Sequence, residues 1–174
     1  MCNLFTAAPT DCSSLLYLGD VTEALAGGAK EFKHKIAENN NGLWKLELEF
    51  TMINSLSMQG STSEFAIPDP SSQFITMPVN DFQYIIEEIK SKTNDFVCTN
   101  TTSPAICSSM TNTCSSYYDV LPKIAYIIDA VHYSMPPQAY TFSTPATGYD
   151  YDSCTLLLAP GETTNTVVLG VPFI

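Results

Sequence analysis

The stretch that decides the fold is EFAIPDPSSQFITMP, from Glu64 to Pro78. Two apolar runs, residues 65–67 and 74–75, flank a polar centre that contains Asp69. This pattern predicts a strand, a tight loop and a second strand. A carboxylate is costly to bury unless donors satisfy it, which makes Asp69 a candidate functional residue. Pro-Asp-Pro-Ser-Ser is also a typical exposed turn, so the local pattern leaves both interpretations open.

On the amino-terminal side, the segment WKLELEF at residues 44–50 alternates apolar and charged side chains. Strict alternation predicts a half-buried strand, with the charged face in solvent and without a catalytic role. The chain should stay extended over residues 51–59, up to Gly60. The predicted buried face consists of four residues: Trp44, Leu46, Leu48 and Phe50.

On the carboxyl-terminal side, the apolar period changes to that of a helix, which we expect over residues 80–91 with Asn80 as its N-cap. Its buried stripe consists of Phe82, Ile85, Ile86 and Ile89. Residues 94–116 are rich in Ser, Thr and Asn and are interpreted as a loop stapled by disulfides. A hairpin turn is expected at Asp129-Ala130. Further short strands are expected at residues 15–20, 140–142, 156–158 and 167–170. About eight or nine strands and one helix indicate an antiparallel all-β domain.

Composition excludes several classes of function. The 174 residues contain 18 acidic residues and seven basic residues, all of them lysines, which gives a net charge of -11. Without arginine and with this charge, neither nucleic acid nor an anionic membrane surface is an expected partner. A hydrophobic content of 45% is sufficient for a core, and the length favours one domain over residues 1–174.

Cysteine usage indicates an oxidising compartment. The six cysteines contain no Cys-x-x-Cys pair, and His34 and His132 lie far apart, so no metal site is expected. Disulfides are the better interpretation. Asn100 begins an Asn-Thr-Thr glycosylation sequon, which agrees with that setting.

The two ends of the sequence suggest a longer parent protein. The first residues have no basic region and no long apolar region, so they are not interpreted as a signal peptide, and no apolar run approaches the length of a membrane span. The sequence stops on the apolar segment 171–174. We therefore expect that the final strands of the fold are missing.

Taken in order, these segments resemble the carboxyl-terminal lobe of a pepsin-like aspartic peptidase over nearly the whole sequence. Residues 66–78 resemble the second Asp-Thr-Gly-Thr-Ser loop and its following strand. Residues 121–140 are similar to the block Leu-Pro, Phe-x-Ile-x-Gly, Tyr, Pro-x-x-Tyr. Residues 168–170 resemble the late strand that supports the active-site loop. The resemblance implies that Asp69 is half of a dyad that shares a proton and activates a water molecule.

The departures from the family pattern put catalysis in doubt. Pro70 stands where the family has a Thr or Ser hydroxyl, and Ser71 stands where it has a glycine, so a Cβ should crowd the loop. Ser72 keeps a hydroxyl that could contact Asp69. The amino-terminal lobe, with its own aspartate and its flap, has no counterpart in this sequence.

Two functions follow from the resemblance. The first is an aspartic-type endopeptidase domain that is inactive as a single lobe, with a polypeptide substrate or a missing amino-terminal lobe as its partner. The alternative is a non-catalytic homologue that binds protein or glycan through the former cleft. A homodimer with two Asp69 residues and a serine or cysteine nucleophile are both poorly supported, and no cofactor is expected.

The resemblance also bears on the cysteines and on localisation. It implies a disulfide between Cys114 and Cys154, whereas proximity suggests Cys98–Cys107, which leaves Cys2–Cys12. The parent protein should then reside outside the cell or in a vacuolar or lysosomal lumen.

Overall fold

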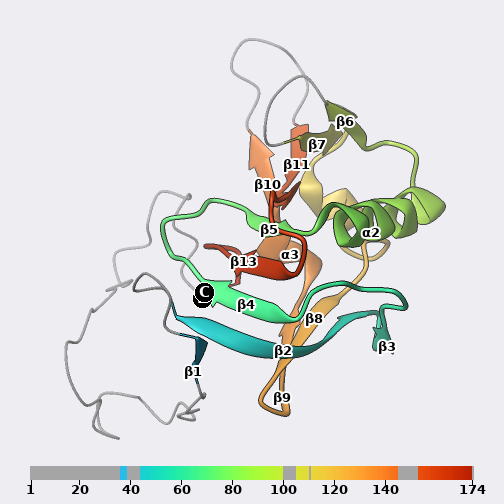
Figure 1. Ribbon diagram of the computed structural model, residues 1–174. Coiled ribbons are helices and arrows are strands. Elements are labelled where there is room, and N and C mark those ends of the chain that lie inside the picture. The colour runs from blue at the N-terminus through green and yellow to red at the C-terminus, as the bar shows by residue number, and fades with distance from the viewer. Residues whose placement is uncertain (1–35, 39–43, 100–104, 110, 145–152, 174) are drawn as a thin grey trace, which may run out of the picture. The chain divides into compact units, whose positions relative to one another are not determined.

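A computed structural model describes residues 36–38, 44–99, 105–109, 111–144 and 153–173. These residues form two β-sheets with three short or medium helical segments (Figure 1). The larger sheet has the order β12-β5-β13-β4-β2-β8-β9, with β1 and β3 also paired to β2, and the smaller sheet has the order β10-β11-β7-β6. The predicted all-β class is therefore confirmed.

The larger sheet contains β1 (Ile36–Glu38), β2 (Lys45–Ile53), β3 (Leu56–Ser57), β4 (Phe65–Pro68), β5 (Ile75–Met77), β8 (Ile124–Ile128), β9 (Val131–Met135), β12 (Leu158–Pro160) and β13 (Thr166–Leu169). The smaller sheet contains β6 (Val97–Thr99), β7 (Ile106–Ser109), β10 (Thr141–Thr144) and β11 (Ser153–Leu156). The helical segments are α2 (Val79–Lys92), α3 (Pro137–Tyr140) and the single 3-10 turn η1 (Cys114–Tyr117).

The expectation of purely antiparallel pairing is wrong for two strand pairs. β13 runs parallel to β4, and β12 runs parallel to β5. β13 and β4 are about a hundred residues apart in the sequence, and β12 and β5 are about eighty residues apart. Hydrophobic alternation carries no information about such distant partners. The expected strand at residues 156–158 is also divided, because β11 and β12 belong to different sheets.

Strand β2 is a strand, but its buried face differs from the predicted one. Leu46 and Leu48 are buried, whereas Trp44 is 67% exposed and Phe50 is 54% exposed. The register shifts between Leu48 and Phe50, which is the effect of a β-bulge. The extra residue moves the alternation by one place, so that Thr51 takes the buried position.

After β2 the chain does not remain extended, as the sequence had suggested. It turns back at Asn54 and Ser55, both with positive φ, and β3 pairs with the end of β2. The β8–β9 hairpin forms as predicted, and its turn residues Asp129 and Ala130 have φ of 49° and 59°. These values are those of a type I′ turn.

Helix α2 buries the predicted stripe of Phe82, Ile85, Ile86 and Ile89. The prediction of Asn80 as N-cap is wrong, because the helix begins one residue earlier and Pro78 occupies the cap position without a side-chain hydrogen bond. A proline that precedes the first turn fixes the backbone where no N–H is needed.

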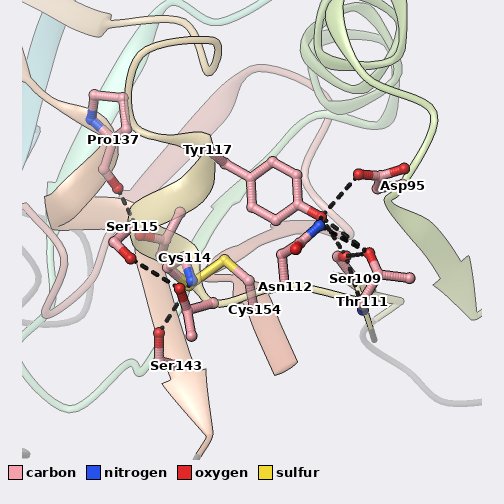
Figure 2. Close-up of a disulfide and its surroundings, with 12 residues drawn as sticks. Asp95, Ser109, Thr111, Asn112, Cys114, Ser115, Tyr117, Pro137, Ser143 and Cys154 are labelled. Carbon is pink, nitrogen blue, oxygen red and sulfur yellow. Dashed lines mark hydrogen bonds between the residues drawn. A yellow bond between two sulfur atoms is a disulfide. The ribbon is translucent and has the colours of Figure 1, made fainter. Parts of the chain in front are cut away.

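The segment 94–116 was expected to be a loop, but it forms the β6–β7 hairpin followed by η1. The disulfide Cys98–Cys107 joins two residues that are register partners in this hairpin. The disulfide Cys114–Cys154 links η1 to β11 and is buried at both ends (Figure 2). Both pairings agree with those expected. Cys2, Cys12, Asn100 and the expected strand at residues 15–20 lie outside the described residues.

Candidate active site

Asp69 follows directly after β4, and its backbone is held by the neighbouring parallel strand. Its N–H donates to the carbonyl of Leu169, the last residue of β13, at 2.9 Å. The N–H of Val171 donates in turn to the carbonyl of Ser72 at 2.9 Å. The two ends of the Asp69 loop are thus fixed to one stretch of chain, residues 169–171.

Gly170 lies between these two contacts and has a steric reason to be glycine. A Cβ at this position would lie 2.2 Å from the carbonyl oxygen of Phe74 and 2.6 Å from that of Ser72. Both are backbone atoms that cannot move without moving the loop. The contact between the late strand and the Asp69 loop therefore depends on the absence of a side chain at Gly170.

The carboxylate of Asp69 is partly exposed and receives two hydrogen bonds from Ser71. The Ser71 hydroxyl donates to Oδ1 at 2.6 Å, and the Ser71 N–H donates to the same oxygen at 2.9 Å. The hydroxyl contact, followed by the N–H contact, lowers the pKa of Asp69 from its ordinary value, against a smaller opposing effect of burial. These donors therefore stabilise the ionised form of the Asp69 carboxyl group.

The expected contact from the hydroxyl of Ser72 to Asp69 is wrong. That hydroxyl donates to the carbonyl oxygen of Phe74 at 2.7 Å, and a hydroxyl has only one proton to give. Ser72 contacts Asp69 through the backbone, where its N–H donates to the Asp69 carbonyl at 3.1 Å. The side-chain hydrogen bond to the Asp69 carboxylate comes instead from Ser71, which the sequence had suggested would only crowd the loop. Ser71 is not among the described residues with positive φ, so its Cβ causes no backbone strain there.

A second polar cluster, which sequence reasoning missed, surrounds the buried carboxylate of Asp81 in the first turn of α2. Asp81 is 2% exposed. Its Oδ2 accepts from the hydroxyls of Ser61, at 2.8 Å, and Ser63, and its Oδ1 accepts from the N–H of Thr62 at 3.2 Å. Asp81 thus ties α2 to the segment that leads into β4. The sequence feature that could have indicated this cluster is an acidic residue, Asp81, beside the apolar stripe of the helix.

Tyr126 lies in the core of the larger sheet near this cluster. Burial raises the pKa of Tyr126, and the charge of Asp81 raises it further. Its hydroxyl has no hydrogen-bond partner among the described residues, and the same holds for Thr51, its register partner on β2. The ring of Phe173 packs edge-on against that of Tyr126 at 5.9 Å between centroids.

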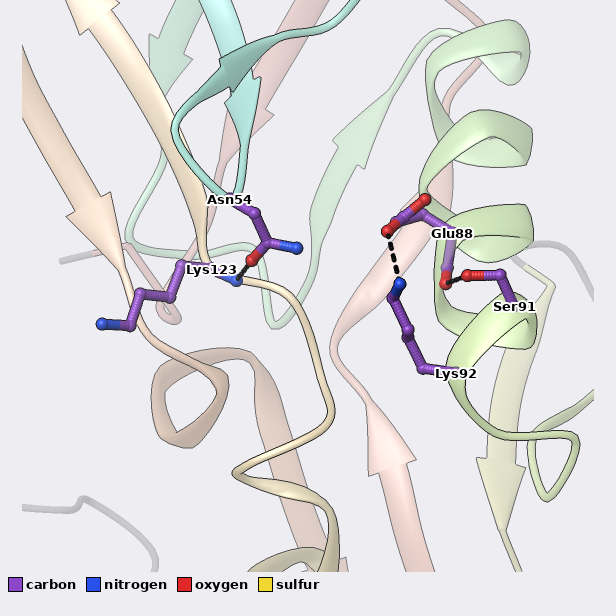
Figure 3. A network of polar contacts seen from close by, with 5 residues as sticks. All are labelled: Asn54, Glu88, Ser91, Lys92 and Lys123. Atoms are coloured by element: carbon purple, nitrogen blue, oxygen red, sulfur yellow. Dashed lines mark hydrogen bonds and ion pairs between the residues drawn. The ribbon is translucent and has the colours of Figure 1, made fainter.

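Other polar networks in the described residues hold elements together. The Tyr117 hydroxyl donates to Asp95 at 2.9 Å and lies 2.7 Å from the Ser109 hydroxyl, which joins η1, β7 and the segment between α2 and β6 (Figure 2). Lys123 donates its N–H to the side chain of Asn54 at 3.0 Å, which fixes the β2–β3 turn to the start of β8 (Figure 3). These contacts have the geometry of structural supports.

Several kinds of site are not found in the described part of the chain. It contains no group of three or more His, Cys, Asp or Glu residues that could hold a metal ion. The cysteines at 98, 107, 114 and 154 are all in disulfides and offer no thiol nucleophile. A search of these residues also finds no helix with the length and apolarity needed to cross a membrane.

Comparison with known proteins agrees with this geometry. No curated protein matches the chain. The family model described as Eukaryotic aspartyl protease matches residues 5–174, which is almost the full length. The match includes the loop of Asp69, strand β13 with the Gly170 that follows it, and the disulfide-linked smaller sheet. The chain therefore belongs to the eukaryotic aspartyl protease family.

Proposed function

We propose that the chain supplies one aspartate, Asp69, to an aspartic-type endopeptidase site and that these 174 residues alone do not hydrolyse peptide bonds. The observation that carries this proposal is the geometry of the loop. Asp69 is anchored at the end of β4 by Leu169, and its Oδ1 is saturated by Ser71. Both hydrogen bonds from Ser71 go to Oδ1, so Oδ2 is the oxygen that we assign to a water molecule or a second carboxyl group.

Peptide hydrolysis by this chemistry needs two carboxyl groups that share one proton. The ionised carboxylate removes a proton from water while the protonated carboxyl group donates to the substrate carbonyl. The lowered pKa of Asp69 favours the first role, because it stabilises the ionised form of the carboxyl group. The same lowered pKa makes Asp69 a weaker base. Apart from the Asp69 loop, which reads Asp-Pro-Ser, the 174 residues contain no segment that resembles an Asp-Thr-Gly loop. A lone Asp69 therefore lacks the acid half of the mechanism.

The test is hydrolysis of a denatured protein by the purified chain at about pH 3–5, the range in which a carboxyl pair would share a proton. We expect no cleavage above that given by the Asp69→Asn variant. Cleavage that disappears in Asp69→Asn would contradict the proposal, because it would mean that two chains assemble a working dyad. Size measurement of the active species would then identify the assembly.

The partner of the site follows from this proposal. A polypeptide substrate would bind only where a second lobe with its own aspartate faces Asp69. The two disulfides, Cys98–Cys107 and Cys114–Cys154, suit the lumen of a vacuole or lysosome or the exterior of the cell.

A specific observation favours the alternative, a non-catalytic homologue that binds protein or glycan through the former cleft. Pro70 offers no N–H and no hydroxyl, so it cannot join a hydrogen-bond lattice between two aspartate loops. Reconstitution separates the two functions. If a lobe with an intact aspartate loop forms a stable complex with this chain but gives no cleavage, the binding function is favoured. Cleavage in the complex favours the peptidase.

A further inference from the structure

The bulge in β2 exposes an aromatic ring that a regular strand would bury. The register shift lies between Leu48 and Phe50, and Glu49 and Phe50 both face solvent as a result. Without the extra residue, Phe50 would follow Leu48 onto the core face and gain the stabilisation of burial. Phe50 is instead 54% exposed. Bulges re-aim side chains and are frequent beside functional sites.

The exposed ring lines an open groove of about 330 Å³. The groove lies between β2, β3 and the segment that leads into β4. Its volume is at the lower end of the range of about 300–1,000 Å³ that is typical of small-molecule sites, so it suits one or two small rings. Its lining combines Phe50 and the buried Met58 with polar residues, mainly Glu49, Ser57, Gln59 and Ser61.

The polar groups of the groove are mainly acceptors. Ser61 and Ser63 donate their hydroxyl protons to Asp81, so each offers only lone pairs to the groove. The carboxylate of Glu49 is an acceptor too. Its Oε1 already accepts from the N–H of Ala130, outside the groove, at 2.7 Å, so Oε2 is the oxygen left for a ligand. Gln59, Ser57 and the buried Thr51 are the lining side chains with protons to give. A ligand that matches this wall must be rich in donors.

The charge of the groove and of the protein restricts the class of ligand further. Glu49 is the only charged residue that lines the groove within the described part of the chain, and the protein has a net charge of -11. Phosphates, carboxylates and other anions are therefore excluded. A flat aromatic ring beside acceptors provides a packing surface for the C–H face of a pyranose, whose hydroxyl groups supply the donors.

We propose that the groove beside Phe50 binds a neutral hexose or a short neutral oligosaccharide. The ring packs on Phe50, and its hydroxyl groups donate to Glu49 and to the serine oxygens. This inference is independent of the peptidase proposal, because the groove lies before β4 whereas Asp69 follows its end.

The test is ligand-observed NMR and calorimetric titration of the whole chain with the methyl glycosides of glucose, mannose, galactose and N-acetylglucosamine. For at least one of them, a ligand of this size should bind with a dissociation constant on the order of 1 mM. The variant Phe50→Leu keeps the residue apolar but removes the ring, and it should weaken binding at least about tenfold. Gln59→Ala, which leaves the strand unchanged, serves if Phe50→Leu fails to fold, and it should also weaken binding.

Trp44→Leu is the matched control, because Trp44 is another exposed aromatic residue, 67% accessible, that does not line the groove. It should leave the affinity unchanged. Absence of binding to all four glycosides would overturn the proposal. Equal loss of binding in Trp44→Leu and Phe50→Leu would overturn it as well. Choline is titrated in parallel as a cationic probe, and binding of choline without binding of any sugar would also overturn the proposal.

Discussion

Replacement of Tyr126 by phenylalanine removes a single oxygen atom from the centre of the larger sheet. Tyr126 is fully buried, and its hydroxyl has no hydrogen-bond partner among the described residues. The ring itself makes the apolar contacts, including the edge-on contact with Phe173. The substitution therefore tests the oxygen atom and leaves the packing in place.

The magnitude follows from two opposing contributions. A hydroxyl group buried without a partner costs about 1–3 kcal/mol, which the substitution recovers. The void left by one oxygen atom destabilises the protein by about a few tenths of a kcal/mol, at about 24 cal/mol per Å³ of cavity. We therefore expect Tyr126→Phe to raise the free energy of unfolding by about 1–2 kcal/mol. With a urea m-value of about 1–3 kcal/mol/M, the midpoint should rise by about 0.3–2 M.

The assay is equilibrium urea unfolding of the disulfide-bonded protein, with Tyr140→Phe as the matched control. Tyr140 is equally buried, but its hydroxyl donates to the carbonyl of Pro122 at 2.6 Å. Its removal should lower the free energy of unfolding by about 1–2 kcal/mol, because the carbonyl loses its donor. Opposite signs for the two variants support the reasoning. Equal destabilisation by both would refute it, because Tyr126 would then have a partner worth as much as that of Tyr140.

Four further predictions concern the site and its supports. Asp81→Ala should lower the free energy of unfolding by about 2–4 kcal/mol, because buried serine donors lose a charged acceptor; a thermal unfolding curve like that of the native protein would contradict this. Ala130→Gly should raise it by about 0.5–1 kcal/mol in urea unfolding, since φ is 59°, and any loss of stability would argue against the turn. Gly170→Ala should cost at least about 2 kcal/mol, because a Cβ would overlap backbone oxygens, whereas a neutral result in the same assay would place the Asp69 loop elsewhere. By carboxyl NMR, Asp69 should titrate below 3.8, and Ser71→Ala should raise this pKa, whereas an unchanged titration in Ser71→Ala would refute the assigned cause. Because the folded pKa is lowered, the stability that Asp69 contributes is present above its ordinary pKa and is lost as the pH falls through the folded pKa.

The sequence predicted the elements of the fold better than their partners. Periodicity identified α2 and the amino-terminal half of β2, because burial on one face imposes a repeat that can be read directly. It failed at Phe50, where a bulge shifts the repeat by one residue, and a bulge has no composition of its own. It also failed for the parallel pairing of β13 with β4, because register between distant strands is set by the whole core.

At the candidate site, the sequence identified the aspartate but not its hydrogen bonds. Asp69 could be located from the order of motifs, whereas the exchange between Ser71 and Ser72 depends on rotamers that the fold selects. Asp81 was missed for a different reason. An aspartate near a helix start is expected to be exposed, and only the approach of the segment 61–63 makes it a buried acceptor.

The structure separates what positions Asp69 from what would make it catalytic. Its position rests on backbone contacts with Leu169 and Val171 and on the missing side chain of Gly170, none of which depends on the side chains that follow Asp69. Its chemistry depends on those side chains, and there Pro70 offers neither an N–H nor a hydroxyl while the hydrogen bonds from Ser71 lower the pKa of the carboxyl group. The position of such a loop and its chemistry can therefore change independently, because different atoms determine the two. For this reason membership of the aspartyl protease family predicts where Asp69 lies, whereas only a hydrolysis assay with Asp69→Asn can decide whether it acts.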